Sequence, residues 1–206
     1  MKRRDNATSS ALLLLTLLLI IVYTLDRWLS FDTLPVPVTK YENWQKLDAQ
    51  GQRVAIDKGP WKCATDLSTG LTWENKSPTE NEYFTKWTYT WQERPSSLAN
   101  VQTGTGGSCS GLGHCDTSHL IQRANLQNMC GYSDWRLPTL DELMTIVDHS
   151  VPEPGPLVCD CLFPHTQRSS YWTSTHDTEK PAGHRFGLDF KTMEKRSFPP
   201  HAALFV

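Results

Sequence analysis

The sequence has little excess of either charge. It contains 20 lysine and arginine residues against 22 aspartate and glutamate residues, and its net charge is -2. After the first four positions, no long run of basic residues occurs. Proteins that bind nucleic acid neutralise phosphates with clustered basic side chains. The sequence therefore predicts no nucleic-acid partner.

Three features of processed exported proteins are missing from the N-terminal part. No cysteine precedes Cys63 and no glycine precedes the first apolar run, so neither a lipidated N-terminal cysteine nor a pilin-type leader is expected. A cleaved signal peptide ends in small residues of the A-x-A type. Here Leu25 is followed by Asp26, Arg27 and Trp28. These absences favour an uncleaved membrane anchor over a removed signal.

The N-terminal part does contain one apolar run, from Ala11 to Leu25. As a helix it spans roughly 22 Å at 1.5 Å per residue, which is short of the ~30 Å hydrocarbon core of a bilayer. Extension from Ala7 to Leu29 closes the gap and places Trp28 at the depth that interfacial aromatic residues favour. We therefore expect residues 10–29 to form a transmembrane signal anchor.

The basic residues at positions 2–4 set the expected orientation, because positive charge beside an apolar segment stays in the cytoplasm. The order that follows is a cytoplasmic N-terminus over residues 1–9, the anchor, a stalk over residues 30–40 and an exported domain over residues 41–206. The stalk contains two prolines, which favour extended chain.

All cysteines lie beyond the anchor, and their number is even. An even count in an exported domain is typical of disulfide bonds. We expect all six to be oxidised: Cys63, Cys109, Cys115, Cys130, Cys159 and Cys161.

Local patterns predict a few elements of the exported domain. Turn-forming residues within Trp61–Glu74 indicate a β-hairpin, and apolar spacing predicts a helix over Thr117–Asn128. Thr139, followed three positions later by a glutamate, forms a capping box that begins a second helix. Short strands are expected over Ser170–Ser174 and Arg185–Phe190.

Four motifs occur in a characteristic order along this domain. They are TGLTWE, CGYSDWRLPTLDEL (Cys130 to Leu143), LFP-x-T (Leu162 to Thr166) and YWTST (Tyr171 to Thr175). In these motifs the chain resembles the Lcl C-terminal domain family of bacteria, over about Trp44 to Phe190. The resemblance implies an α+β fold related to C-type lectins and formylglycine-generating enzymes.

The resemblance also bears on the disulfide pairing. Family members often carry a cysteine in the last strand, whereas this chain ends His201–Val206 without one. A disulfide within Cys-x-Cys departs from preferred geometry. We therefore expect Cys109 to pair with Cys115, and Cys63 and Cys130 each to pair with one of the two cysteines at positions 159 and 161, in an order that sequence leaves open.

Two kinds of metal site have simpler alternatives in this sequence. Cys109, His114, Cys115 and His119 have spacings that can bind zinc, but an exported location favours disulfides. The Glu-Pro-Asn and Trp-Asn-Asp signatures of calcium-dependent lectins are absent. We therefore expect no metal site and no cofactor.

The candidate ligand-binding residues are Trp135, Arg136 and Trp172. The structural alternative for the first two is a core tryptophan and an arginine paired with a buried carboxylate. If Trp135 is buried, its replacement by alanine should cost about 3 to 5 kcal/mol.

No serine occupies a nucleophile-elbow motif, and Asp141 and Glu142 are explained by favourable charge at a helix N-terminus. We therefore expect a non-catalytic binding or adhesion-type module of the bacterial cell envelope. It would be anchored once in the inner membrane, with its domain in the periplasm or outside the cell and a glycan or an envelope protein as ligand. One alternative is an accessory subunit of an envelope assembly such as a pilus or secretion machine. Another is an oxidase-like enzyme that uses Cys159 and Cys161.

Overall fold

The structure is a computed structural model of the whole chain. It describes residues 41–81, 83–92, 107–109, 115–152 and 155–206. One compact unit within it begins at Asn43 and ends at Val206.

The expected N-terminus (1–9), anchor (10–29) and stalk (30–40) all lie outside the described residues. Within the part of the chain that is described, no helix is both long and apolar enough to cross a bilayer.

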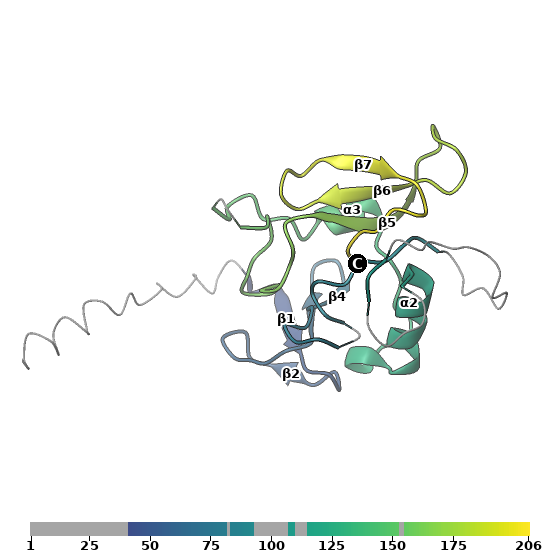
Figure 1. The fold of residues 1–206 in the computed structure, drawn as a ribbon. Helices are drawn as coiled ribbons and strands as arrows, with labels where there is room; N and C mark the ends of the chain where they lie inside the picture. Colours follow the sequence, from purple (N-terminus) through teal and green to yellow (C-terminus); the bar gives the residue numbers. More distant parts are fainter. Residues whose placement is uncertain (1–40, 82, 93–106, 110–114, 153–154) are drawn as a thin grey trace, which may run out of the picture. The chain divides into compact units, whose positions relative to one another are not determined.

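A four-stranded antiparallel sheet forms from the first part of the domain, with the order β2-β1-β3-β4 (Figure 1). Its strands are β1 (Trp44–Leu47), β2 (Arg53–Val54), β3 (Cys63–Asp66) and β4 (Thr72–Glu74). Strand β4 is therefore an edge strand, and its residue Glu74 lies opposite Cys63 of β3.

The β3–β4 connection confirms the predicted hairpin. The carboxylate of Asp66 accepts hydrogen bonds from the backbone N–H and the hydroxyl of Ser68 and from the hydroxyl of Thr69. Gly70 has φ +74°, in the left-handed region that a tight hairpin requires and that glycine adopts without strain. The Asp-x-Ser-Thr-Gly sequence thus fixes the turn that places β4.

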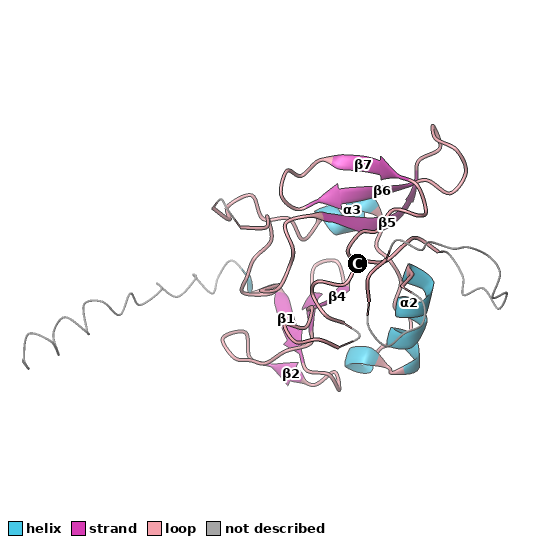
Figure 2. Cartoon of the chain, in the orientation of Figure 1, coloured by secondary structure: helices cyan, strands magenta, loops and turns pink. Residues whose placement is uncertain are grey.

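The second sheet is antiparallel and has the order β5-β6-β7. Its strands are β5 (Ser170–His176), β6 (Arg185–Asp189) and β7 (Lys195–Phe198). The first two confirm the predicted strands, although β5 is longer and β6 ends one residue earlier than expected. Loops and turns connect most elements (Figure 2).

Helix α2 (Thr117–Leu126) confirms the first predicted helix. The side chain of Asp116 caps its N-terminus, and Leu120 and Ala124 are buried on its inner face. The helix ends two residues before the predicted boundary because Asn128 has φ 48°, which a right-handed helix does not admit.

Helix α3 (Leu140–Met144) begins at the predicted capping box. The Thr139 hydroxyl accepts from the backbone N–H of Glu142, and the Glu142 carboxylate accepts from the backbone N–H of Thr139. The helix stops before Val147, and the side chain of Met144 is half exposed. Helix α3 is therefore short and buries only Leu140 and Leu143.

The disulfides correct the expected pairing. Cys109 pairs with Cys115 as expected, but Cys63 pairs with Cys130, and Cys159 pairs with Cys161. All six cysteines are oxidised, as predicted.

The pairing of Cys130 follows from the way its turn packs against the β1–β2 turn. Turn η2 (Met129–Gly131) places Cys130 so that its backbone N–H donates to Ala49 O at 3.1 Å. A Cβ on Gly51 would meet Cys130 O at 2.6 Å, so only glycine permits this approach. The Cα atoms of Cys63 and Cys130 are consequently 6.4 Å apart.

The C-terminal segment joins the second sheet to the segment around Tyr89. Trp172 of β5 donates its backbone N–H to Phe205 O at 2.9 Å. Two backbone hydrogen bonds of 2.8 and 3.1 Å connect Tyr89 and Leu204. The described domain is therefore an α+β structure with two small antiparallel sheets and short helices.

Candidate functional site

A cavity of about 310 Å³ lies between the edge strand β4, helix α2, the segment before α3 and strand β5. Its walls are mainly apolar and aromatic, and include Trp73, Ile121, Trp135, Leu143, Phe163 and Trp172. An apolar cavity of about 150 Å³ is enough to hold benzene. The cavity is therefore large enough for an aromatic or branched aliphatic group.

The edge of β4 forms one wall of the cavity. Consecutive residues Gly70 to Glu74 all border it, although successive side chains of a strand point to opposite faces. Thr65 of β3 and Thr72 of β4 lie opposite each other, and their hydroxyl oxygens are 2.9 Å apart. Such close side chains are typical of a non-hydrogen-bonded pair, in which the backbone N–H and C=O groups of the two residues point away from the partner strand. The cavity therefore follows the open edge of the sheet.

The three residues predicted to bind ligand, Trp135, Arg136 and Trp172, all border this one cavity. Trp135 packs against the core cluster, as the structural alternative expected, but it is only partly buried and also borders the cavity. Its indole N–H donates to Met129 O at 3.0 Å. Its backbone N–H donates to Asn125 Oδ1 at 2.6 Å, so helix α2 fixes its position.

Arg136 forms a two-point ion pair with Glu142, with distances of 2.8 Å from Nη1 to Oε2 and 2.6 Å from Nη2 to Oε1. Glu142 is only partly buried, so the expectation of a buried carboxylate is wrong. The hydrogen bond from Arg136, and the bond from Thr139 N–H, overcome the smaller effect of burial and lower the pKa of Glu142 to about 2. The pair stays charged and holds the DWRLPT segment to the start of α3.

Trp172 serves the core more than the cavity. Its side chain is 1% exposed, and its indole N–H donates to Tyr89 O at 2.7 Å. Both features anchor β5 to the segment around Tyr89.

Sequence reasoning missed Trp73 as a candidate. Its indole N–H is buried and has no hydrogen-bond partner among the residues that the structure describes. A buried donor without a partner costs free energy and requires an explanation, such as a bound water or ligand. Trp73 belongs to the TGLTWE motif, but the motif gives no indication that the indole N–H is buried without a partner.

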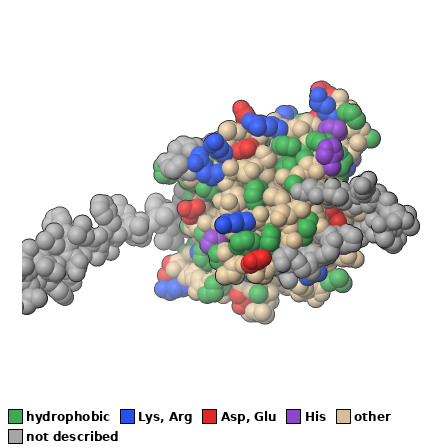
Figure 3. Space-filling model, in the orientation of Figure 1, with side chains coloured by type: hydrophobic (Ala, Val, Ile, Leu, Met, Phe, Trp, Pro, Cys, Tyr) green, Lys and Arg blue, Asp and Glu red, His purple; other side chains and the backbone are tan. Residues whose placement is uncertain are grey.

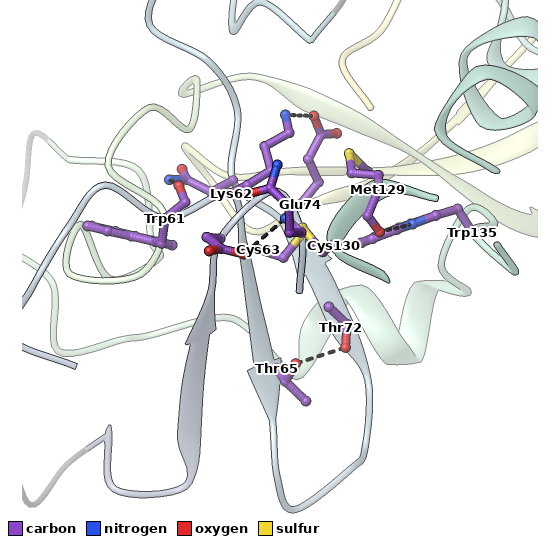
Figure 4. Close-up of a disulfide and its surroundings, with 12 residues drawn as sticks. Trp61, Lys62, Cys63, Thr65, Thr72, Glu74, Met129, Cys130 and Trp135 are labelled. Carbon is purple, nitrogen blue, oxygen red and sulfur yellow. Dashed lines mark hydrogen bonds and ion pairs between the residues drawn. A yellow bond between two sulfur atoms is a disulfide. The ribbon is translucent and has the colours of Figure 1, made fainter. Parts of the chain in front are cut away.

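Sequence reasoning also missed a buried cluster of three charges beside the cavity. Lys62 Nζ lies 3.0 Å from Glu74 Oε1, and Lys76 Nζ pairs with Glu74 Oε2. The Lys62, Glu74 and Lys76 side chains are only 21%, 14% and 13% exposed. Figure 4 shows Lys62 and Glu74 pointing toward each other beyond the Cys63–Cys130 disulfide. No sequence motif predicted this cluster, because its members approach only when the hairpin has formed.

The charges of this cluster are not balanced. Burial works to raise the pKa of Glu74, but the ammonium groups of Lys76 and Lys62 outweigh it and hold the pKa below its ordinary value. Burial lowers the pKa of Lys76, and the Glu74 carboxylate offsets this only in part. Two ammonium groups therefore share one carboxylate, with one positive charge in excess.

By contrast, on the face seen in Figure 3, acidic and basic side chains are interspersed.

The residues whose spacing could have bound zinc make other interactions in the structure. Cys109 and Cys115 form a disulfide, and His119 Nδ1 lies 2.7 Å from Asp116 Oδ2. His114 is outside the described residues. In the described part of the chain, no three histidine, cysteine or acidic residues gather as metal ligands.

The residues of the oxidase alternative lie apart from the cavity. Cys159 and Cys161 are joined in a disulfide, and neither borders the cavity. The geometry thus brings no cysteine to the candidate site.

The architecture defines a class: a small α+β domain, cross-linked by disulfides, that encloses an aromatic cavity beside a sheet edge. A profile of the Lcl C-terminal domain matches residues 62–205, and the chain belongs to this family. The match includes the C-terminal segment beyond Phe190, which the motifs alone did not cover. No curated protein and no solved structure matches the chain significantly.

Proposed function

We propose that this protein is a membrane-anchored, non-catalytic binding module of the bacterial cell envelope. The cavity carries this proposal, because its walls are mainly apolar and aromatic and it lies beside the buried charges of Lys62, Glu74 and Lys76. Binding sites are concave and mostly apolar, with a few polar groups that orient the ligand. The ligand would be part of a glycan or of an envelope protein.

The proposed location rests on the sequence and on the disulfides. Basic residues at positions 2–4 and the apolar run within 10–29 support a single inner-membrane anchor. The disulfides support an oxidising compartment, since disulfides persist outside the cytoplasm. The domain would lie in the periplasm or outside the cell.

We further propose that the fold is related to C-type lectins and formylglycine-generating enzymes. The family membership and the α+β architecture support this relation. Fold alone does not define a ligand, so the function rests on the cavity.

A fluorine NMR experiment tests the proposed function. The full-length chain in phosphatidylcholine nanodiscs is screened with neutral fluorinated aromatic amides, and we expect the fluorine lines of some of them to broaden. Ile121→Trp should abolish the broadening because Ile121 is half buried and borders the cavity. Gln122→Trp is the matched control, since residue 122 is exposed on the same helix.

Two results would count against the proposal. One is the absence of broadening by any amide with the wild-type chain. The other is broadening that Ile121→Trp leaves intact, because the amides would then bind elsewhere.

A further inference from the structure

We propose that the cavity recognises a carboxylate carried on a compact apolar body, with Lys76 as the group that binds the carboxylate. This inference rests on the proposed function and names the ligand group that the same cavity takes. Its basis is that Lys76 borders the cavity and belongs to a buried cluster in which two ammonium groups share one carboxylate.

The first argument is the kind of polar group that the cavity offers. Lys76, which borders the cavity, has an ammonium group with three N–H donors and no acceptor. Its Nζ pairs with Glu74, whose carboxylate it shares with Lys62. A carboxylate supplies two acceptor oxygens, and hydrogen bonds between charged groups are roughly twice as strong as neutral ones.

The second argument is the excess positive charge of the cluster formed by Lys62, Glu74 and Lys76. Lys62 and Lys76 share the single carboxylate of Glu74, and all three side chains are mostly buried. Burial lowers the pKa of Lys76, which reflects the loss of hydration around its ammonium group. A carboxylate that enters the cavity would neutralise the excess positive charge of the cluster, which a neutral water molecule does not do.

The third argument concerns the other charged groups around the cavity. Arg136 and Glu142 neutralise each other in their ion pair. Asp134 also borders the cavity but is exposed, so solvent and salt screen its repulsion of an anion. Burial raises the pKa of Tyr171 above its ordinary value and keeps that phenol neutral. The cluster of Lys62, Glu74 and Lys76 is therefore the group of charges beside the cavity that attracts an anion.

The apolar walls limit the rest of the ligand. Trp135, Ile121 and Phe163 surround a space of about 310 Å³. An aryl or branched alkyl acid fits such a space, either as a free acid or as the C-terminal residue of an envelope protein.

Equilibrium dialysis of the full-length chain in phosphatidylcholine nanodiscs tests the inference. Radiolabelled phenylacetate should bind more tightly than phenylacetamide, which has the same ring without the charge. Lys76→Gln should weaken phenylacetate binding by about tenfold or more, and it should weaken phenylacetamide binding much less, since a neutral amide makes the weaker hydrogen bond to an ammonium group. Lys58→Gln is the control, because Lys58 is exposed, pairs with Asp57 and does not border the cavity.

Glu74→Gln gives a second, opposite expectation. Removal of the competing carboxylate leaves two ammonium groups for the ligand, so phenylacetate should bind more tightly. Opposite effects of two substitutions in one cluster cannot both arise from a loss of folding. A free peptide ending in phenylalanine and its C-terminal amide, tested in the same way, distinguish a protein C-terminus from a free acid as the source.

Several results would overturn the inference. Equal affinities for phenylacetate and phenylacetamide, an unchanged affinity in Lys76→Gln, or weaker binding in Glu74→Gln would each do so. If phenylacetamide binds and Ile121→Trp blocks it, the proposed function survives without the carboxylate. If neither compound binds, the inference falls, and the proposed function falls as well only if no amide of the fluorine NMR screen binds.

Discussion

Simultaneous replacement of Cys63 and Cys130 by alanine should lower the free energy of unfolding by about 4 kcal/mol. The two residues are 67 positions apart, and a cross-link that closes a loop of this length removes much of the entropy of the unfolded chain. The disulfide also ties turn η2 to strand β3, and both half-cystines are buried. Urea unfolding followed by tryptophan fluorescence measures the loss.

The Cys159–Cys161 disulfide provides the matched control. It spans only 2 positions, so its entropic effect on the unfolded chain is much smaller. The double alanine variant at these positions should therefore unfold at a urea concentration near that of the wild type. Equal losses from the two variants would contradict this account of the disulfides.

Replacement of Trp172 by alanine should cost about 3 to 5 kcal/mol, a large part of the roughly 5 to 15 kcal/mol that stabilises a domain. The indole is 1% exposed, and its ring centroid lies 5.9 Å from that of Phe198 and 6.1 Å from that of Trp91. The substitution also leaves Tyr89 O without its hydrogen-bond donor. Urea unfolding at a single pH gives the difference.

Trp135→Ala is the comparison for this prediction. Because Trp135 is only half buried, its loss should cost clearly less than the loss of Trp172. A Trp135→Ala variant that is less stable than Trp172→Ala would show that Trp135, and not Trp172, anchors the core.

Local signals in the sequence predicted the parts of the fold that depend on neighbouring residues. The Asp66 to Gly70 turn and the capping box between Thr139 and Glu142 each satisfy their hydrogen bonds within a few positions. Because the residues that form these hydrogen bonds are close in the sequence, local patterns predicted the hairpin and the start of α3 correctly.

Long-range contacts were harder to predict. The pairing of Cys63 with Cys130 depends on the approach of Gly51 to Cys130 O, which no local pattern encodes. The expected partners at positions 159 and 161 were chosen because this chain lacks the last-strand cysteine of the family and because a disulfide within Cys-x-Cys departs from preferred geometry, but these two cysteines pair with each other.

The candidate site was predicted in part. The DWRLPT motif led to Trp135 and Arg136, and both border the cavity. Lys62 and Lys76 were not identified, because lysine is common on surfaces and only the folded hairpin brings both to Glu74. Buried charge clusters of this kind are visible only once the tertiary structure is known.

The most direct test of the binding-module account is to locate a bound ligand among the 8 tryptophans of the chain. The full-length protein is prepared with 5-fluorotryptophan, and its fluorine signals are assigned through single tryptophan-to-phenylalanine substitutions. On addition of a bound aromatic amide, the account predicts shifts of the Trp73 and Trp135 signals, since both border the cavity. Shifts confined to Trp61 and Trp87, which do not border it, would contradict the account.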